Sequence, residues 1–192
     1  MVSNTLKDDD IFIGKMPDFS RPVIFLDFDG VVSPVDYERA YKNRENRKFV
    51  SDKDLLKGRN LIVPWSPLPF YMDVIEFLRE QNCLWITSWQ DATQDVLNPL
   101  LGFDFGYIKT KNIHGRRFVN KNIAYKLEAV AQTVERFGCD WILVDDDARY
   151  KKDPLESVGL RSGFYIAPDS YKGLSEDECK KIKDYIDEIT NK

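Results

Sequence analysis

The sequence is poor in the residues that build disulfide frameworks and zinc sites. It has only 3 cysteines, Cys83, Cys139 and Cys179, and a single histidine, His114, among 192 residues. The cysteines lie far apart, without the paired spacing of zinc ligands or of a disulfide framework. We therefore expect reduced, partly buried thiols in a cytoplasmic protein, and no structural zinc. Because no second histidine or cysteine pair lies near it, we interpret His114 as a surface or substrate-side residue.

Long hydrophobic runs, internal repeats and low-complexity segments are also missing. No apolar stretch approaches the length of a transmembrane helix. The polar, acidic start of the sequence does not have the pattern of a signal peptide. The net charge of −4 is small, so overall charge argues neither for nor against nucleic acid as a partner. We expect no membrane association, and no obligate protein partner is evident.

The residues that are present can bury a substantial core. The chain is 43% hydrophobic and 13% aromatic, which suits one compact domain and argues against a second full domain. We expect a lead-in at residues 1–20 and a single domain at residues 21–192.

Short apolar runs alternate with helical patterns along the chain. Continuous hydrophobic runs predict strands at residues 22–28, 83–88, 103–108, 141–144 and 162–166. Helices are predicted at residues 37–42, 69–81 and 91–101, from the cap Asn122 to residue 137, and after a capping box of Ser175 and Glu178. This alternation predicts an α/β fold, a Rossmann-like three-layer α/β/α sandwich with a central, mainly parallel sheet.

The first of these strands ends in two carboxylates, Asp27 and Asp29, followed by Gly30. Side chains alternate along a strand, so Asp27 and Asp29 leave the chain on the same side. Two carboxylates this close repel each other unless a cation lies between them or one is protonated. Gly30 permits a sharp turn and a close approach to the backbone. An ordinary turn would also use these residue types, so the motif indicates a functional site only together with the other motifs of the chain.

Polar residues also follow two other predicted strands. Thr87 and Ser88 end the strand at 83–88, and Asp145 to Asp147 follow the strand at 141–144. Ligands bind at the carboxyl ends of strands in parallel sheets, so these residues are expected to meet the Asp27 motif there. Neighbours on a strand face opposite ways, so only one of Thr87 and Ser88 can serve the site. At least one of the three aspartates is expected to cap a turn instead.

The long polar segment at residues 33–67 is a candidate small cap or substrate loop. Basic and aromatic residues alternate in it, as in surfaces that bind phosphates joined to bases, and Arg44 and Arg47 are the candidate substrate ligands. A second basic stretch runs from Lys109 to Arg117. Nearby acidic residues leave an ordinary solvated surface as an equal alternative. Trp85 and Trp141 are expected in the core, and Trp89 at the mouth of the site.

The order of these motifs resembles the haloacid dehalogenase (HAD) superfamily of phosphatases and phosphotransferases. The resemblance covers roughly residues 22–190 and depends most on the segment from Asp27 to Val32. Further phrases are similar to a small-cap subgroup that includes the phosphatase-like domains of bacterial RNA-repair (Swiss army knife) proteins. These phrases are Leu84–Ala92, Leu97–Gly102, Lys126–Val130 and Trp141–Asp146.

The resemblance implies a Mg²⁺-dependent phosphatase that forms an aspartyl-phosphate. Asp27 would attack phosphorus, and Asp29 would protonate the leaving oxygen and then activate water. Thr87 would bind a phosphoryl oxygen, and Lys126 would neutralise charge. The metal would be held by Asp27, by the backbone carbonyl of Asp29, and by Asp145 or Asp146. A small cap leaves room for a bulky phosphorylated substrate, such as a nucleic-acid end.

Several alternatives remain open at this point. The motif alignment favours Thr87 over Ser88 and Lys126 over Lys121, although Lys126 would also suit a solvated helix surface. Asp145 and Asp146 are equal candidates for the metal. A phospho-receiver signalling domain or a non-catalytic binding module on a similar α/β fold is the alternative function.

Overall fold

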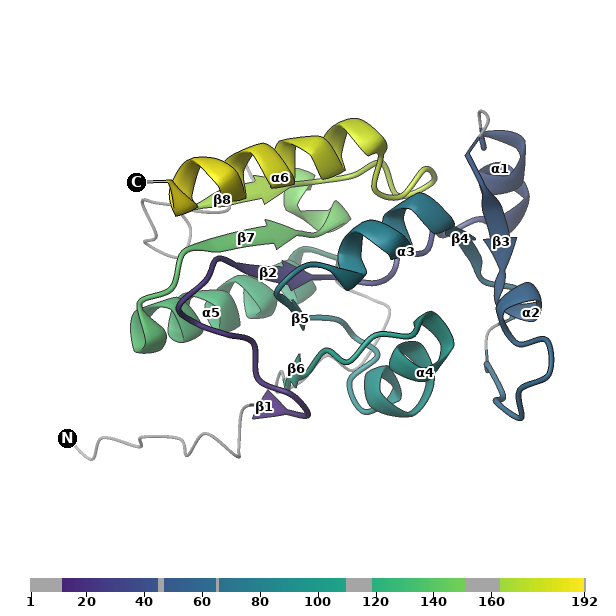
Figure 1. The fold of residues 1–192 in the computed structure, drawn as a ribbon, viewed down its shortest axis with the longest axis horizontal. Coiled ribbons are helices and arrows are strands. Elements are labelled where there is room, and N and C mark those ends of the chain that lie inside the picture. The colour runs from purple at the N-terminus through teal and green to yellow at the C-terminus, as the bar shows by residue number, and fades with distance from the viewer. Residues whose placement is uncertain (1–11, 45–46, 65, 110–118, 151–162, 192) are drawn as a thin grey trace.

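The computed structural model describes residues 12–44, 47–64, 66–109, 119–150 and 163–191. The chain forms a mixed α/β fold around a mainly parallel six-stranded sheet (Figure 1). In spatial order the strands are β1 (Phe12–Ile13), β6 (Tyr107–Ile108), β5 (Cys83–Trp85), β2 (Val23–Leu26), β7 (Trp141–Val144) and β8 (Phe164–Ile166). All neighbouring pairs are parallel except β1 with β6, which is antiparallel at the edge.

Helices cover both faces of this sheet, which explains why its central strands are continuously apolar. Alternate side chains of β2 point to opposite sides, and all of them are buried. Val23 and Phe25 pack with residues of α5 (Val119–Phe137). Ile24 and Leu26 belong to the core on the other face, which three further helices cover. These are α3 (Met72–Arg79), α4 (Asn98–Leu101) and α6 (Glu176–Thr190).

A small insertion stands beyond the carboxyl ends of β2 and β7 (Figure 1). It contains α1 (Tyr37–Lys42), β3 (Phe49–Ser51), α2 (Asp52–Leu55) and β4 (Pro69–Tyr71). Strands β3 and β4 form their own antiparallel pair. The insertion covers the segment at 33–67 and extends past it to the end of β4 at Tyr71. The predicted helix at 37–42 is confirmed, with Asp36 as its N-cap.

Two helix predictions need correction. The helix expected at 69–81 begins only at Met72, because Pro69–Tyr71 pairs with β3 as strand β4. The helix expected at 91–101 consists of a π-helical turn, η2 (Thr93–Leu97), followed by the short α4, and it ends at Gly102 as predicted. Helix α5 begins at Val119, so Asn122 lies inside the helix and is not its cap.

The expected lead-in is partly structured. Phe12 and Ile13 form β1 against β6, and the Phe19 ring stacks on Phe137 of α5. The expected strand at 103–108 is reduced to its last two residues. The capping box of Ser175 and Glu178 at the start of α6 is confirmed.

Further expectations concern membrane-spanning helices, the cysteines, two tryptophans and the second basic stretch. None of the helices that the structure describes has the length and hydrophobicity needed to span a membrane. All three cysteines are buried and unpaired, and Trp85 and Trp141 lie in the core as predicted. Most of the second basic stretch, including His114, lies outside the described residues.

Candidate functional site

The ends of three adjacent strands meet at one point of the sheet. Strand β2 lies between β5 and β7, and backbone hydrogen bonds extend this pairing to the first residues after the strands. The Asp27 N–H donates to the Val144 carbonyl at 2.9 Å, and the Ile86 N–H donates to the Leu26 carbonyl at 2.9 Å. Asp27, Thr87 and Asp145 therefore emerge side by side, which confirms the convergence predicted from the chain order.

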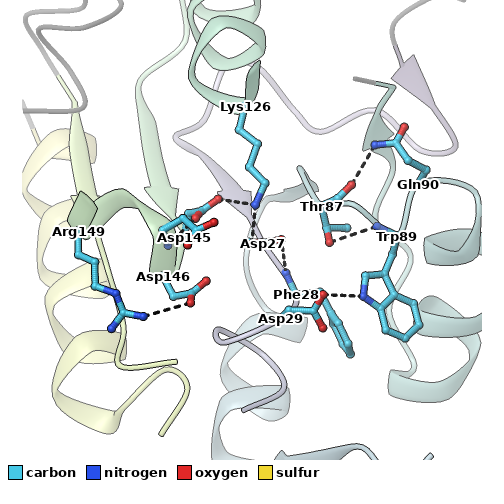
Figure 2. A network of polar contacts seen from close by, with 11 residues as sticks. Asp27, Phe28, Asp29, Thr87, Trp89, Gln90, Lys126, Asp145, Asp146 and Arg149 are labelled. Atoms are coloured by element: carbon cyan, nitrogen blue, oxygen red, sulfur yellow. Dashed lines mark hydrogen bonds and ion pairs between the residues drawn. The ribbon is translucent and has the colours of Figure 1, made fainter. Parts of the chain in front are cut away.

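Lys126 reaches this point from α5 and joins two of the strand ends (Figure 2). Its Nζ lies 2.5 Å from Oδ2 of Asp27 and 2.7 Å from Oδ2 of Asp145. The residue is only 4% exposed, so the alternative of a solvated helix lysine is excluded. The side chain of Lys121, the other candidate, lies outside the described side chains.

Three carboxylates share a small volume beside Lys126. One oxygen from each of Asp27, Asp145 and Asp146 lies within 4.8 Å of the others, and all three side chains are largely buried. The second oxygen of Asp145 accepts the Asp147 N–H at 2.9 Å, which fixes that side chain. Three carboxylates face a single buried ammonium, and a hard divalent cation is the chemical group that such an all-oxygen set accommodates.

Gly30 makes room for one of these carboxylates. Its backbone has φ +73°, and a Cβ built on it would lie 2.6 Å from Cγ of Asp146. A side chain at position 30 would therefore displace Asp146 from the cluster. The sequence indicated a sharp turn and a close approach at Gly30, and the approaching group is this carboxylate.

Burial controls protonation in the cluster. Burial raises the pKa of Asp27 to about 8; Lys126 opposes this rise and Asp145 adds to it. Burial likewise raises the pKa of Asp146 to about 7, with repulsion from Asp145 adding to the effect. Burial disfavours the charged form of Lys126, but Asp145 and Asp27 together raise its pKa above the usual value. Without a metal, the cluster therefore retains protons that free aspartates would lose.

Asp29 stands apart from the cluster, at the lip of a hollow. Its Oδ2 accepts a hydrogen bond from Nε1 of Trp89 at 3.0 Å, and the Trp89 ring contacts Phe28 edge-on at 4.7 Å (Figure 2). Asp29 is an exposed residue at this lip. The protein around its carboxyl group still removes part of the solvent, and this desolvation raises the pKa of Asp29. The hydrogen bond from Trp89 opposes the rise. Its carboxylate does not join the carboxylates of the cluster, so only its backbone carbonyl remains as the metal ligand that the sequence suggested.

Thr87 and Ser88 differ in exposure, but both lie after β5 rather than in it, so strand alternation is not the cause of the difference. Thr87 is buried and its Oγ1 lies 3.5 Å from the Trp89 backbone N, whereas Ser88 is exposed. Gln90, with φ +44°, donates from Nε2 to the Thr87 carbonyl at 2.9 Å and holds this turn. Thr87 therefore lies toward the cluster side, and Ser88 lines the hollow.

The hollow beside Asp29 has a volume of about 550 Å³. Its walls come from the turn after β2, the start of α1, the approach to β4 and the turn after β5. The lining residues are Asp29, Ser33, Pro34, Val35, Tyr37, Pro67, Leu68, Pro69, Ser88 and Trp89. A hollow of similar size, about 570 Å³, lies near the start of β5 and shares no residue with the carboxylate cluster. The position of Trp89 at the mouth agrees with the expectation.

The structure does not bring Arg44 and Arg47 to the site. The Arg47 guanidinium lies 2.8 Å from Oδ2 of Asp73, donates to the Leu174 carbonyl at 3.0 Å, and stacks 3.8 Å over the Tyr71 ring. Arg44 donates to the carbonyl of Tyr41 and lies over its ring. Neither arginine lines the hollow. The role of both arginines as substrate ligands stays a prediction, while the contacts of Arg47 fix the insertion to the rest of the fold.

The sequence reasoning missed two contributors to the site. Arg149 lies 3.4 Å from Oδ2 of Asp146 and donates to Oγ of Ser170 at 2.8 Å. Arg149 follows Asp146 by three residues, and this spacing of opposite charges in a helical turn is a sequence signal that could have identified the pair. The Phe28 N–H donates to Oδ1 of Asp27 at 2.8 Å, and no side-chain pattern reveals such a backbone donor.

The assembled site thus offers a buried carboxylate with a positioned ammonium, two further carboxylates suited to a divalent cation, and an adjacent hollow with its own carboxylate. Comparisons with protein-family models, with curated proteins and with solved structures returned no match.

Proposed function

We propose that this chain is a Mg²⁺-dependent phosphomonoester hydrolase of the HAD type, acting through an aspartyl-phosphate on Asp27. The observation that carries the proposal is the buried cluster of Asp27, Asp145 and Asp146 around the Lys126 ammonium. A structural salt bridge would need one carboxylate for one ammonium. Burying more carboxylates than ammonium groups costs free energy unless the working site also holds a cation.

Asp27 is the nucleophile in this proposal. One of its carboxylate oxygens attacks phosphorus, and the bond from phosphorus to the alcohol oxygen breaks. Asp29 gives its proton to that oxygen as it leaves. In the second half-reaction the Asp29 carboxylate takes a proton from water, whose oxygen attacks phosphorus. The bond to Asp27 then breaks and inorganic phosphate is released.

Two further side chains stabilise the charge on the phosphoryl group. Lys126 lies within hydrogen-bond distance of Asp27, so its ammonium is beside the oxygens of a phosphoryl group bound there. Thr87 is buried at the end of the neighbouring strand, where its hydroxyl can donate to a phosphoryl oxygen. Both side chains are fixed by the fold before a substrate arrives.

The residues present fit a Mg²⁺ ion. The carboxylates of Asp27, Asp145 and Asp146 are grouped closely, and Gly30 leaves the space that Asp146 needs. Asp27 and one or both of the other two would hold the ion, together with the backbone carbonyl of Asp29. When bound, Mg²⁺ supplies positive charge that offsets the carboxylates and the phosphate.

The proposed substrates include nucleotides and nucleic-acid ends, in keeping with a nucleic-acid repair role. The small size of the insertion supports this range of substrates, because it leaves the hollow at Asp29 open to solvent. The basic residues of the insertion do not support it, because Arg44 and Arg47 are engaged elsewhere.

The test measures phosphate release from p-nitrophenyl phosphate and from 5′- and 3′-phosphorylated oligonucleotides, with Mg²⁺ or with EDTA. We expect Mg²⁺-dependent release that falls by about a thousandfold or more in Asp27→Asn. Asp104→Asn is the matched control, because that carboxylate is exposed and pairs only with Lys15 in the described structure. Thermal unfolding confirms that each variant is folded.

Turnover that survives in folded Asp27→Asn would refute the aspartyl-phosphate. A folded wild-type chain that binds Mg²⁺ but releases phosphate from none of these substrates would favour the alternative of a binding or phospho-receiver module.

A further inference from the structure

We propose that the hollow beside Asp29 is a subsite for the alcohol part of the substrate, and that it selects a flat, uncharged ring. The preferred substrates would then be phosphomonoesters whose alcohol carries an aromatic or heteroaromatic ring, rather than alcohols that place a second anionic group in the hollow. This inference rests on the proposed function and adds to it the chemistry of the leaving group.

The position of the hollow matches that of a leaving group. Asp29 is the residue that connects the two parts of the site, since its backbone follows Asp27 closely and its carboxylate lines the hollow. In Figure 2, Asp29 and Trp89 lie on one side of Asp27, and Asp145 and Asp146 lie on the other. A phosphate at Asp27 therefore has the carboxylate cluster on one side and the hollow on the other.

The walls of the hollow are mostly apolar and include two aromatic rings, Tyr37 and Trp89. Trp89 is held by its hydrogen bond to Asp29 and by its edge-on contact with Phe28. Tyr37 lines the hollow and contacts the Phe49 ring edge-on at 5.4 Å. The apolar surface is completed by Pro34, Val35, Pro67, Leu68 and Pro69. Fixed aromatic faces bind flat rings by stacking or edge contacts with little loss of side-chain freedom.

The charge of the hollow excludes a second anion. None of the lining residues that the structure describes is lysine or arginine, and the single charged residue among them is Asp29. A second phosphate or a carboxylate placed there would lose water without gaining a cation, and would be repelled by Asp29. The hydroxyls of Ser33 and Ser88 can instead bond to polar atoms of a neutral ring.

The volume also fits such a group. At about 550 Å³ the hollow falls within the size range of small-ligand pockets. The space accommodates a base or an aryl group, and both offer the same flat, uncharged surface. The test therefore includes one substrate of each kind.

The experiment compares kcat/KM, with Mg²⁺, for phosphates of primary alcohols, so that leaving-group basicity stays similar. The substrates are benzyl, 4-carboxybenzyl and butyl phosphate, with thymidine 5′-phosphate as the nucleoside example. We expect benzyl phosphate to exceed both butyl and 4-carboxybenzyl phosphate by about tenfold or more. The ranking of thymidine 5′-phosphate against benzyl phosphate then distinguishes a base from a simple aryl group.

Two substitutions at Tyr37 test the wall directly. In Tyr37→Ala and in the bulkier Tyr37→Leu, the ratio of benzyl to butyl kcat/KM is expected to fall toward one. Tyr165→Ala is the matched control, because this tyrosine is part-exposed on the edge strand β8 and does not line the hollow. A ratio that is unchanged in folded Tyr37 variants would overturn the assignment of this wall.

Binding of non-hydrolysable phosphonates separates the two proposals. Benzylphosphonate is expected to bind the Mg²⁺-loaded wild-type chain about tenfold more tightly than butylphosphonate, measured by calorimetry. Equal turnover of all four phosphates would overturn the subsite while the hydrolase proposal stands. Ring-selective phosphonate binding without any turnover would support the subsite and overturn the hydrolase proposal.

Discussion

At the scale of single residues, the contact between Gly30 and Asp146 determines whether the carboxylate cluster can form. The Gly30 backbone has φ +73°, and the space where its Cβ would stand is filled by the Asp146 carboxylate. Gly58 has a similar φ of +80° but no atom within 4 Å of a built Cβ. The two glycines thus have similar positive φ values and differ in what surrounds them.

This difference gives a matched pair of variants. Gly58→Ala should lose about 1 kcal/mol of unfolding free energy, because alanine is strained at positive φ. Gly30→Ala should lose more, because its Cβ would also collide with the Asp146 carboxylate. Only Gly30→Ala should also weaken Mg²⁺ or Mn²⁺ binding, by about tenfold to a hundredfold, since Asp146 must move. Urea unfolding and calorimetric metal titration measure the two effects. Equal metal affinities in the two variants would exclude Asp146 as a ligand.

Most residues of the site could be predicted from the sequence because each follows a recognisable strand. Asp27, Thr87 and Asp145 stand at the ends of apolar runs, and the order of the runs implied that they meet. The roles of Arg44 and Arg47 could not be predicted in this way. A basic residue in a loop gives no local signal of its partner, and the partner of Arg47, Asp73, is distant in the sequence.

At the scale of elements, Arg47 connects the insertion to the sheet domain. Its guanidinium bonds Asp73 of α3 and the Leu174 carbonyl before α6, and it covers the Tyr71 ring of β4. The side chain is only 14% exposed, so these contacts are largely shielded from water. The insertion is thereby held beside the site at several points.

Arg47→Ala is expected to lower the unfolding free energy by about 2–3 kcal/mol, because Asp73 is left without its cation. Arg44→Ala is the control and should cost less than about 1 kcal/mol, since it removes only a contact with Tyr41. Urea unfolding measures both changes. If Arg47 were a substrate ligand instead, its removal would raise KM and leave the unfolding free energy nearly unchanged.

The elements that the sequence predicted well are those stabilised on both faces. Strands β2 and β7 are buried on both sides, so their runs of apolar residues are unbroken. Residues 69–71 were assigned to a helix because their strand conformation depends on pairing with β3, which is not a local property. Strand β1 is only two residues long, and no periodicity can develop over that length.

At the scale of the whole molecule, protonation of the site is coupled to folding. The pKa values of Asp27, about 8, and of Asp146, about 7, lie above the ordinary aspartate value of 3.8. At pH values between 3.8 and these raised pKa values, the metal-free folded chain binds more protons than the unfolded chain. The contribution of Asp27 and Asp146 to the free energy of unfolding is therefore fully present at low pH, and it is lost as the pH rises through 7 and 8.

The metal-free chain should accordingly unfold at a lower temperature at about pH 8.5 than at about pH 6 in EDTA. Mg²⁺ must displace the retained protons, so it should bind more tightly, and raise the unfolding temperature more, at the higher pH. Scanning fluorimetry at both pH values measures this. Asp146→Asn should flatten the dependence on pH in EDTA. A larger Mg²⁺ effect at pH 6 would contradict the assignment of the metal site.

The central place of β2 has a consequence for how the chain reaches its native state. Ile24 pairs with Cys83 on one side and with Ile142 on the other, so its partners are distant in the sequence. During synthesis β2, which precedes Asp27, is made before both β5 and β7, so it stays unpaired on one side until β7 has been made. High contact order of this kind slows folding. The segment that ends at Asp27 is therefore translated before either of its neighbours in the sheet, and the site is complete only after β7 has paired with β2.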